Sequence, residues 1–438
     1  MRVVTLCASA RLLVQRPRTA LERLSLISVV VALVACKEQQ QVTAPRDGLV
    51  VPLQDHAVGP PVDVPAKGRF IFRHWTFGDE QFWTDTLHLN EVVETAVSPA
   101  TALAVGLKVD AERLPPGFLA SADLTSPATT VELLRRDAVV GIEAKVTADK
   151  HIKRLGITCA LCHSTVDNSV TAGVGRRLDG LPNRDLNVGA IVALSPALPA
   201  AVKAVFNSWG PGKYDAEFNR DGINSPVVLP PALGLRGVAL ETYTAEGPVS
   251  YWNAYVAVTQ MHGHGSFSDP VLGINIQQTP DLVTPVLPAL RDYQLSLKTP
   301  PPPPGSFDRA AAERGKLVFK TTGQCASCHI PSLAFTDINL GILHTPSEIG
   351  VDPVRASRLK NHKYRTTPLR ALWQHPPYFH DGSAATLLDV VEHYDRFFAL
   401  HLSPQQKGDL VEYLKSGPPR RAADDREGRD RDGHDREE

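Results

Sequence analysis

Hydrophobic side chains recur at helical spacing along the second half of the chain. Residues 308–319 (DRAAAERGKLVF) and 385–400 are typical of amphipathic helices, and the second run places on one face Leu387, Val391, Tyr394 and Phe398. Residues 403–414 begin with a capping serine, a first-turn proline and a glutamine three positions after the serine, which predicts another helix. A further helix is expected at 130–139, and strand patterns are sparse. The chain is therefore predicted to be mainly α.

The first 36 residues have the pattern of an export signal. An arginine-rich stretch at 1–23 precedes the apolar run Leu24–Ala35, which is too short to span a bilayer. Leu33-Val34-Ala35-Cys36 resembles the lipobox of bacterial lipoproteins, in which the cysteine carries the lipid; an ordinary cleaved signal peptide is the alternative. The lipoprotein interpretation predicts a periplasmic protein anchored only through Cys36. Lys37 follows in place of aspartate, which favours the outer membrane.

Composition narrows the classes of function. The chain has 438 residues, a formal net charge of -1 and 43% hydrophobic residues, which is enough for two or three domains with their own cores. A neutral balance offers no electrostatic surface for nucleic acid, and no apolar run suits an integral membrane protein. The polar, proline-rich segment 37–65 is interpreted as a flexible tether, and segment 419–438 as a disordered charged tail.

The six cysteines carry the strongest chemical signal. Cys7 leaves with the signal and Cys36 is assigned to the lipid, while the other four form two C-x-x-C-H motifs: Cys159, Cys162 and His163, then Cys325, Cys328 and His329. Two thiols one helical turn apart can add to the two vinyl groups of one porphyrin edge, and the adjacent histidine ligates the iron. Zinc sites place their cysteine pairs much closer together, a dithiol redox motif needs no histidine, and a disulfide within a motif would close a very small ring. Two covalently bound haem c groups are predicted.

These motifs divide the chain into two parts. A stiff connector at Lys298–Gly305 (KTPPPPPG) separates a first haem c domain, residues 66–297, from a second at 306–418. The first part includes an extension at 66–150, whose segment Gly68–Trp83 is rich in aromatic residues. The predicted fold is mainly α, with two cytochrome c-like haem domains and an N-terminal extension.

The residue opposite each motif histidine decides whether an iron passes electrons or binds a substrate. Met261 is the only methionine after Met1, so at most one iron can have histidine–methionine ligation. It stands beside His262 and His264 in a glycine-containing stretch. This stretch is predicted to supply a distal ligand or an acid–base group to the first haem; a surface loop with Met261 as packing is the alternative.

For the second haem the candidates are Tyr394, on the apolar face of its predicted helix, and His393 beside it. A core tyrosine with a hydrogen-bonded hydroxyl is the alternative for Tyr394. His380 either contacts a haem propionate or lies in a turn. Near the first motif, three arginines are candidates to pair with propionates, with a solvated loop as the alternative: Arg176, Arg177 and Arg184.

Several segments of the second half together resemble the bacterial di-haem cytochrome c peroxidase and MauG superfamily. They surround the second motif, span about residues 285–416, and include Thr366–Arg370 (TTPLR), Pro376–Ser383 (PPYFHDGS) and Thr386–Arg396 (TLLDVVEHYDR). The resemblance implies two cytochrome c-like domains with one haem each. It also implies that Tyr394 is the distal ligand of the C-terminal haem, because this position is tyrosine in MauG and methionine in the peroxidases.

The resemblance implies two further features. Tyr251-Trp252 falls where the family has an aromatic pair whose tryptophan relays electrons between the haems. Asn224, with the backbone oxygens of His375 and Pro377, falls where the family holds a calcium ion between the domains.

The first half departs from the family at the acid–base residues. Asp179 stands where the peroxidases have their distal histidine, and no glutamate follows Trp252 at the expected distance. Peroxide chemistry would then depend on His262 or His264.

The sequence therefore favours a peroxidase-like, MauG-like oxidoreductase. In this interpretation the N-terminal haem is reactive, with His262, His264 and Trp252 as catalytic candidates, and the C-terminal haem relays electrons. Its partners would be a periplasmic electron-transfer protein and peroxide or a small substrate. Two alternatives remain: an electron-transfer cytochrome without a substrate, and an oxygenase acting on an organic substrate, which the aromatic segment 66–83 would wall.

Overall fold

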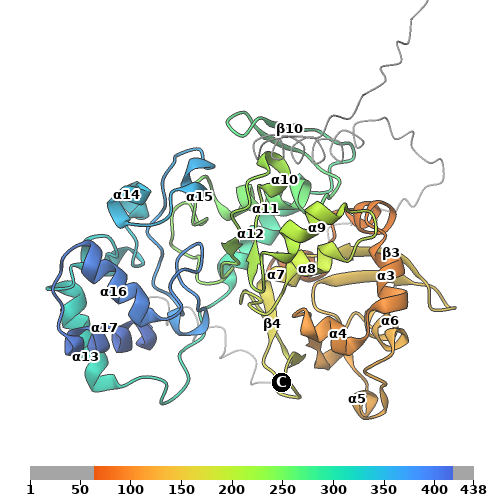
Figure 1. The fold of residues 1–438 in the computed structure, drawn as a ribbon, viewed down its shortest axis with the longest axis horizontal. Helices are drawn as coiled ribbons and strands as arrows, with labels where there is room; N and C mark the ends of the chain where they lie inside the picture. The colour runs from red at the N-terminus through yellow and green to blue at the C-terminus, as the bar shows by residue number, and fades with distance from the viewer. Residues whose placement is uncertain (1–63, 418–438) are drawn as a thin grey trace, which may run out of the picture. The chain divides into compact units, whose positions relative to one another are not determined.

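The computed structural model describes residues 64–417 (Figure 1). The predicted signal and lipid anchor, nearly all of the tether and the charged tail lie outside the described residues. Helix α2 begins at Val64, so the last two residues assigned to the tether are helical. None of the helices in the described part of the chain is long and apolar enough to cross a membrane.

Helices and short strands alternate up to the proline-rich connector. The helices of this part are α2 (Val64–His74), α3 (Leu89–Ala96), α4 (Pro99–Ala104), α5 (Phe118–Ser121), α6 (Pro127–Arg135), α7 (Ala160–His163), α8 (Val188–Ala193), α9 (Ala200–Asn207), α11 (Val249–Thr259) and α12 (Leu287–Ser296). A π-helical turn, Phe82–Thr86, follows α2. The segment Glu217–Asn224, which contains α10 (Phe218–Asp221), forms a unit separate from the other described residues.

The strands form two-stranded ladders rather than one extended sheet. One pair is parallel, β1 (Val109–Asp110) with β5 (Val174–Gly175). The antiparallel pairs are β2 (Ile142–Val146) with β3 (Ile152–Ile157), β4 (Ser164–Val166) with β6 (Arg177–Asp179), β7 (Lys213–Tyr214) with β8 (Val227–Val228), and β9 (Phe267–Asp269) with β10 (Ile274–Ile276). The prediction of a mainly helical protein is confirmed.

The extension shares its core with the first cysteine motif. The β1–β5 pair joins residue 109 to residue 174, and the β2–β3 hairpin leads directly into the motif at Cys159. Two core clusters combine side chains from both stretches. One contains Trp83, Leu134 and Leu161, and the other contains Phe72, Phe77, Ala160 and Met261. Residues 66–150 are therefore part of the structure that holds the motif.

The second half contains α13 (Arg309–Lys320), α14 (Pro346–Ile349), α15 (Val354–Ser357), α16 (Leu387–Phe397) and α17 (Pro404–Ser416). Helices α13 and α17 pack closely because Gly315 has no side chain: a Cβ there would lie 1.9 Å from the carbonyl oxygen of Asp409. Phe319, Val391 and Leu410 belong to the core cluster that these helices bury with α16.

The predicted helices of this half are confirmed, and each of them begins after a residue that caps its N-terminus. Asp308 caps α13 by accepting a hydrogen bond from the amide of Ala311. Thr386 begins α16 and Ser403 begins α17, each with a reciprocal capping box. The helix expected at 130–139 is α6, which begins earlier, at Pro127, and ends at Arg135.

Candidate functional site

The first C-x-x-C-H motif forms one helical turn, α7, directly after the β2–β3 hairpin. The ring nitrogen Nδ1 of His163 lies 3.1 Å from the carbonyl oxygen of Pro230. Because a carbonyl only accepts, Nδ1 carries the proton and Nε2 keeps its lone pair for a metal. Burial lowers the pKa of His163 to about 4. The hydrogen bond to Pro230 opposes this shift, and the positive charge of Arg184 adds to it. The imidazole is therefore neutral, as an iron ligand must be.

The second motif has the same arrangement on a different scaffold. A 3-10 turn, Cys325–Ser327, follows α13 and presents His329. Its Nδ1 donates to the carbonyl oxygen of Phe335 at 3.2 Å, which again leaves Nε2 available. Burial lowers the pKa of His329. Two motifs on unrelated local structures thus orient their histidines in the same way.

The four motif cysteines are free thiols rather than disulfides. Burial is the main reason why the pKa of Cys159 and of Cys162 is raised to about 12, and that of Cys325 to about 11. Neutral thiols in an apolar environment suit thioether bonds to a porphyrin better than zinc, which requires thiolates. The donor set of each motif, two thiols and one oriented neutral imidazole, therefore fits a covalently attached haem.

One other group of possible metal ligands lies beside the second motif. Ligand atoms of Cys328, Asp337 and His344 lie within 4.8 Å of one another. However, Nε2 of His344 is 2.8 Å from an Asp337 oxygen, so these two side chains satisfy each other. Because Cys328 belongs to the haem motif, we assign this group to the surroundings of the second site.

Tyr394 lies near the cysteines of the second motif, and its role as a distal ligand stays a prediction. It is half-buried on α16, where desolvation raises its pKa to about 12, with Cys328 and Cys325 close enough to contribute. Its ring packs against Phe398 and Phe379, and its hydroxyl makes no hydrogen bond to any described residue. A core tyrosine would normally satisfy its hydroxyl.

The other candidates in this region are engaged elsewhere. Nε2 of His393 lies 3.0 Å from the carbonyl oxygen of Ile349. His380 stacks on the ring of Tyr364 and lies 3.3 Å from its hydroxyl. These contacts favour Tyr394 over His393 as the candidate ligand and account for His380 without a propionate.

The residues predicted for the distal side of the first haem lie after α11. Met261 is 4% exposed and packs in the core cluster that includes Ala160 of the motif. His262 has a positive φ of 60° and stacks on Phe82, with ring centroids 3.6 Å apart, and burial lowers its pKa to about 4. Nδ1 of His264 bonds the carbonyl oxygen of Pro280 at 2.6 Å. The structure thus places Met261 and His262 in the interior and ties His264 to a loop.

Trp252 lies on α11 against a residue from the second half of the chain. The guanidinium of Arg355, on α15, lies 5.8 Å from the centre of the Trp252 ring and 5.9 Å from that of Tyr243. Arg355 is 1% exposed, and its Nε donates to the Tyr243 hydroxyl at 3.1 Å. The tryptophan predicted to relay electrons therefore contacts the chain segment that follows the second motif.

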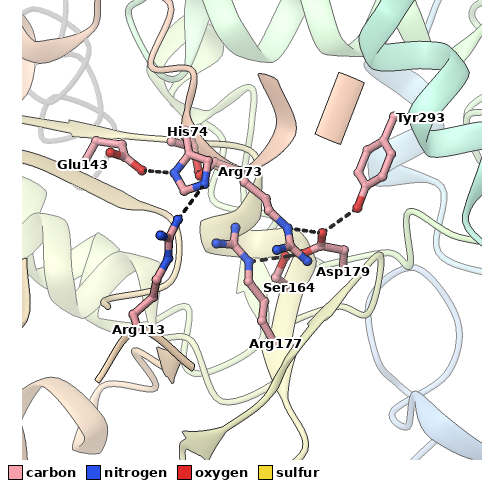
Figure 2. A network of polar contacts seen from close by, with 9 residues as sticks. Arg73, His74, Arg113, Glu143, Ser164, Arg177, Asp179 and Tyr293 are labelled. Atoms are coloured by element: carbon pink, nitrogen blue, oxygen red, sulfur yellow. Dashed lines mark hydrogen bonds and ion pairs between the residues drawn. The ribbon is translucent and has the colours of Figure 1, made fainter. Parts of the chain in front are cut away.

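Asp179, at the family's distal-histidine position, is the centre of an ion-pair network (Figure 2). Its carboxylate accepts hydrogen bonds from Arg73 at 2.6 Å, Arg177 at 3.1 Å, Ser164 at 2.8 Å and Tyr293 at 2.5 Å. Burial would raise the pKa of Asp179, but the two arginines outweigh it and the net shift is downward. An ionised, fully bonded carboxylate has a structural role here: it joins α2 and α12 to the strand that follows His163.

The three arginines predicted to meet propionates differ in their surroundings. Arg176 is exposed and lies 3.5 Å from Asp167, which matches the solvated-loop alternative. Arg177 belongs to the Asp179 network. Arg184 lies near His163 and donates from Nη2 to the carbonyl oxygen of His375 at 3.1 Å. This contact disfavours calcium at the same oxygen, because a guanidinium already holds it; the calcium site stays a prediction.

Two buried ionisable residues near these sites were missed from the sequence. Asp79 is 0% exposed, accepts hydrogen bonds from Trp83 and the amide of Ile157, and is close enough to Cys159 to affect its pKa. Burial raises the pKa of Asp79 well above its usual value. The position of Asp79 within the aromatic run 68–83 could have indicated this residue from the sequence. Arg355 had no comparable signal, because its contacts with Trp252 and Tyr243 are distant in sequence.

The aromatic segment itself packs in the interior. Phe72 is 0% exposed, Phe77 is 1% exposed and Trp83 is 6% exposed. These side chains fill the core around the first motif, which is a sufficient reason for their presence without an organic substrate.

Comparison with known proteins gives partial matches. No family model matches the chain. Over 122 residues the chain is 30% identical to the methylamine utilization protein MauG of Methylophilus methylotrophus, a match covering 24% of this chain and 36% of that protein. The match thus spans about a third of the relative's length. Among solved structures, a hydrazine synthase of Kuenenia stuttgartiensis aligns at 21% identity with a TM-score of 0.30, over 44% of this chain and 72% of that one. The MauG match agrees with the resemblance that the sequence motifs carry.

Proposed function

We propose that this protein is a di-haem c-type oxidoreductase of the peroxidase-like, MauG-like kind. The observation that carries the proposal is the shared geometry of the two motifs. In each, two neutral thiols accompany a buried histidine whose Nδ1 donates to a backbone carbonyl and whose Nε2 is available. When bound, the two haem groups would supply one-electron redox chemistry, and the remaining steps fall to the chain's own side chains.

The residues suggest different roles for the two sites. His163 and His329 would hold the proximal positions, and Tyr394 lies close to Cys325 and Cys328 with no hydrogen bond from its hydroxyl to any described residue. Trp252 lies on α11 with Arg355 of α15 over its ring, and it is proposed as the relay between the sites. His262, which stacks on Phe82, and His264, whose Nδ1 bonds the Pro280 carbonyl, are the two histidines proposed to serve the first site.

The setting is also part of the proposal. A periplasmic protein held by a lipid at Cys36 would exchange electrons with a periplasmic electron-transfer protein and act on peroxide or a small substrate. The export pattern supports this setting, since haem c is attached outside the cytoplasm.

The first test is haem stoichiometry. Pyridine haemochrome analysis and the intact mass of the purified protein should give two haems, and the double variant Cys159→Ser/Cys162→Ser should retain one. The matching variant Cys325→Ser/Cys328→Ser should retain the other. Haem that acid–acetone extracts, or a mass without two haem increments, would contradict the proposal.

The second test separates an enzyme from an electron carrier. Asp179 cannot act as the missing acid–base residue because its carboxylate is saturated, and this observation favours the carrier as the second candidate. An enzyme with an open iron should show a high-spin ferric EPR signal that changes when peroxide or cyanide is added. Two low-spin haems that respond to neither would establish the carrier.

A further inference from the structure

Hydrogen bonds of the preceding residue, Asn183, hold Arg184 beside the first motif. The amide of Asn183 donates to the carbonyl oxygen of Cys162 at 2.9 Å, and the Asn183 side chain donates to the carbonyl oxygen of Gly106 at 2.9 Å. The following residue, Arg184, is therefore fixed relative to Cys162 and His163. Its charge is close enough to His163 to lower the pKa of that imidazole.

The guanidinium of Arg184 is only partly satisfied. Nη2 donates to the carbonyl oxygen of His375, while Nε and Nη1 are buried and have no partner among the described residues. Burial lowers the pKa of Arg184 to about 10, so the group remains charged at neutral pH. A buried, charged donor without an acceptor is costly, because it has lost its hydrogen bonds to water and gained none in return. Two such donors on one cation, neither with a partner among the described residues, therefore indicate an anion that the described part of the chain does not supply.

The loop that Arg184 contacts also contains buried polar atoms without a hydrogen-bond partner among the described residues. His375 follows a 3-10 turn, Leu372–Gln374, in which Nε1 of Trp373 and Oε1 of Gln374 are buried without partners among the described residues. The loop thus has one unsatisfied donor, Nε1 of Trp373, and one unsatisfied acceptor, Oε1 of Gln374, directly before the residue whose carbonyl oxygen Arg184 contacts. A carboxylate suits either of the unsatisfied Arg184 donors, because a charged guanidinium makes strong hydrogen bonds to carboxylate oxygens; Nε and Nη1 lie on different edges of the guanidinium, so each donates singly.

We propose that Arg184 binds a propionate of the haem attached at Cys159 and Cys162, and so ties this haem to the loop 372–378 of the second half. A donor without a partner among the described residues, Nε or Nη1, holds the carboxylate, and Nη2 stays on the His375 carbonyl. The inference rests on the proposed di-haem function. Arg184 acts as a positioning residue, and its positive charge favours the reduced iron, which carries one positive charge fewer than the oxidised iron.

The test compares Arg184→Gln with Arg176→Gln in the haem-loaded protein. Arg176 provides a matched control, because it is an exposed arginine in the same region with an Asp167 partner. Spectroelectrochemical titration of Arg184→Gln should show a lower midpoint potential for one haem only. The oxidised-to-reduced ratio should change at least tenfold, which is 59 mV for one electron. Hydrogen exchange in residues 372–378 should increase, and neither effect should appear in Arg176→Gln.

If Arg184→Gln does not accumulate as folded protein, resonance Raman spectroscopy of a second variant, Arg184→Lys, tests the inference. Arg184→Lys keeps the charge but loses the planar guanidinium, so the propionate bending band of one haem should shift while its potential changes less. Unchanged potentials in Arg184→Gln, or unchanged propionate bands in Arg184→Lys, would overturn the inference. A wild-type protein with fewer than two haems would instead refute the proposed function, so the two failures are distinguishable.

Discussion

Replacement of Asp179 by asparagine tests the ion-pair network that joins α2 and α12 to the first motif. The side chains of Asp179 and Arg177 are 3% and 4% exposed, so water cannot take over their interaction. Asparagine keeps the shape but leaves Arg177 and Arg73 without a counter-charge, and one amide oxygen cannot accept from four donors. Breaking a buried pair by removing one partner costs about 3–5 kcal/mol, and we expect Asp179→Asn to lower the free energy of unfolding by this amount.

The stability that Asp179 contributes should depend on pH in a defined direction. The pKa of Asp179 is lowered in the folded protein, so its contribution to stability is present above the unfolded-state pKa of about 4. It is lost as the pH falls through the folded-state pKa. The stability difference between wild type and Asp179→Asn should therefore be largest at neutral pH and shrink in acid.

Urea unfolding of the haem-loaded protein, followed by circular dichroism at pH 7 and at pH 4 and below, measures both effects. Asp292→Asn is the matched control, because Asp292 is exposed, adjoins Tyr293 and makes no ion pair with any described residue. A loss below about 1 kcal/mol at pH 7, the level of a surface pair, would refute the reasoning. A difference between wild type and variant that does not depend on pH would also refute it.

Two further predictions concern the second half. Gly315→Ala should lower the free energy of unfolding by about 1–3 kcal/mol, because its Cβ would collide with the Asp409 backbone. Gly408→Ala on α17, which meets nothing within 4 Å, should raise it by about 0.5–1 kcal/mol; equal effects in urea unfolding would contradict the packing argument. Tyr394→Phe should alter the optical spectrum of one haem, while Tyr413→Phe, a core tyrosine near Cys325, should alter none; an unchanged Tyr394→Phe spectrum would remove that ligand.

Local sequence determined the helices and motifs of the second half. Ser403 with Gln406, and Asp308 before an alanine-rich run, specify helix starts through contacts within one turn, and the structure places α17 and α13 accordingly. The spacing within C-x-x-C-H also acts over one turn, which is why the motif could be identified from sequence.

Contacts between residues far apart in the chain were decided only by the tertiary structure. The extension appeared to be an addition to a haem domain, yet β1 pairs with β5 and its aromatic side chains fill the core around the first motif. The propionate prediction named three arginines with equal standing. Their partners separate them. Arg176 is exposed beside Asp167, and Arg177 pairs with Asp179 although its Nη2 lacks a partner among the described residues. Arg184 has no carboxylate partner among the described residues, and two of its buried donors are unsatisfied there.

The sequence by itself therefore determined where each haem can be attached and which histidine can hold it, because both follow from bonds and angles within a few residues. Only the tertiary structure decided which charges are buried, which are paired, and which face the two motifs. The reason is physical: the energy of a charge depends on the dielectric and the partners around it, and the folded chain brings those partners from distant positions.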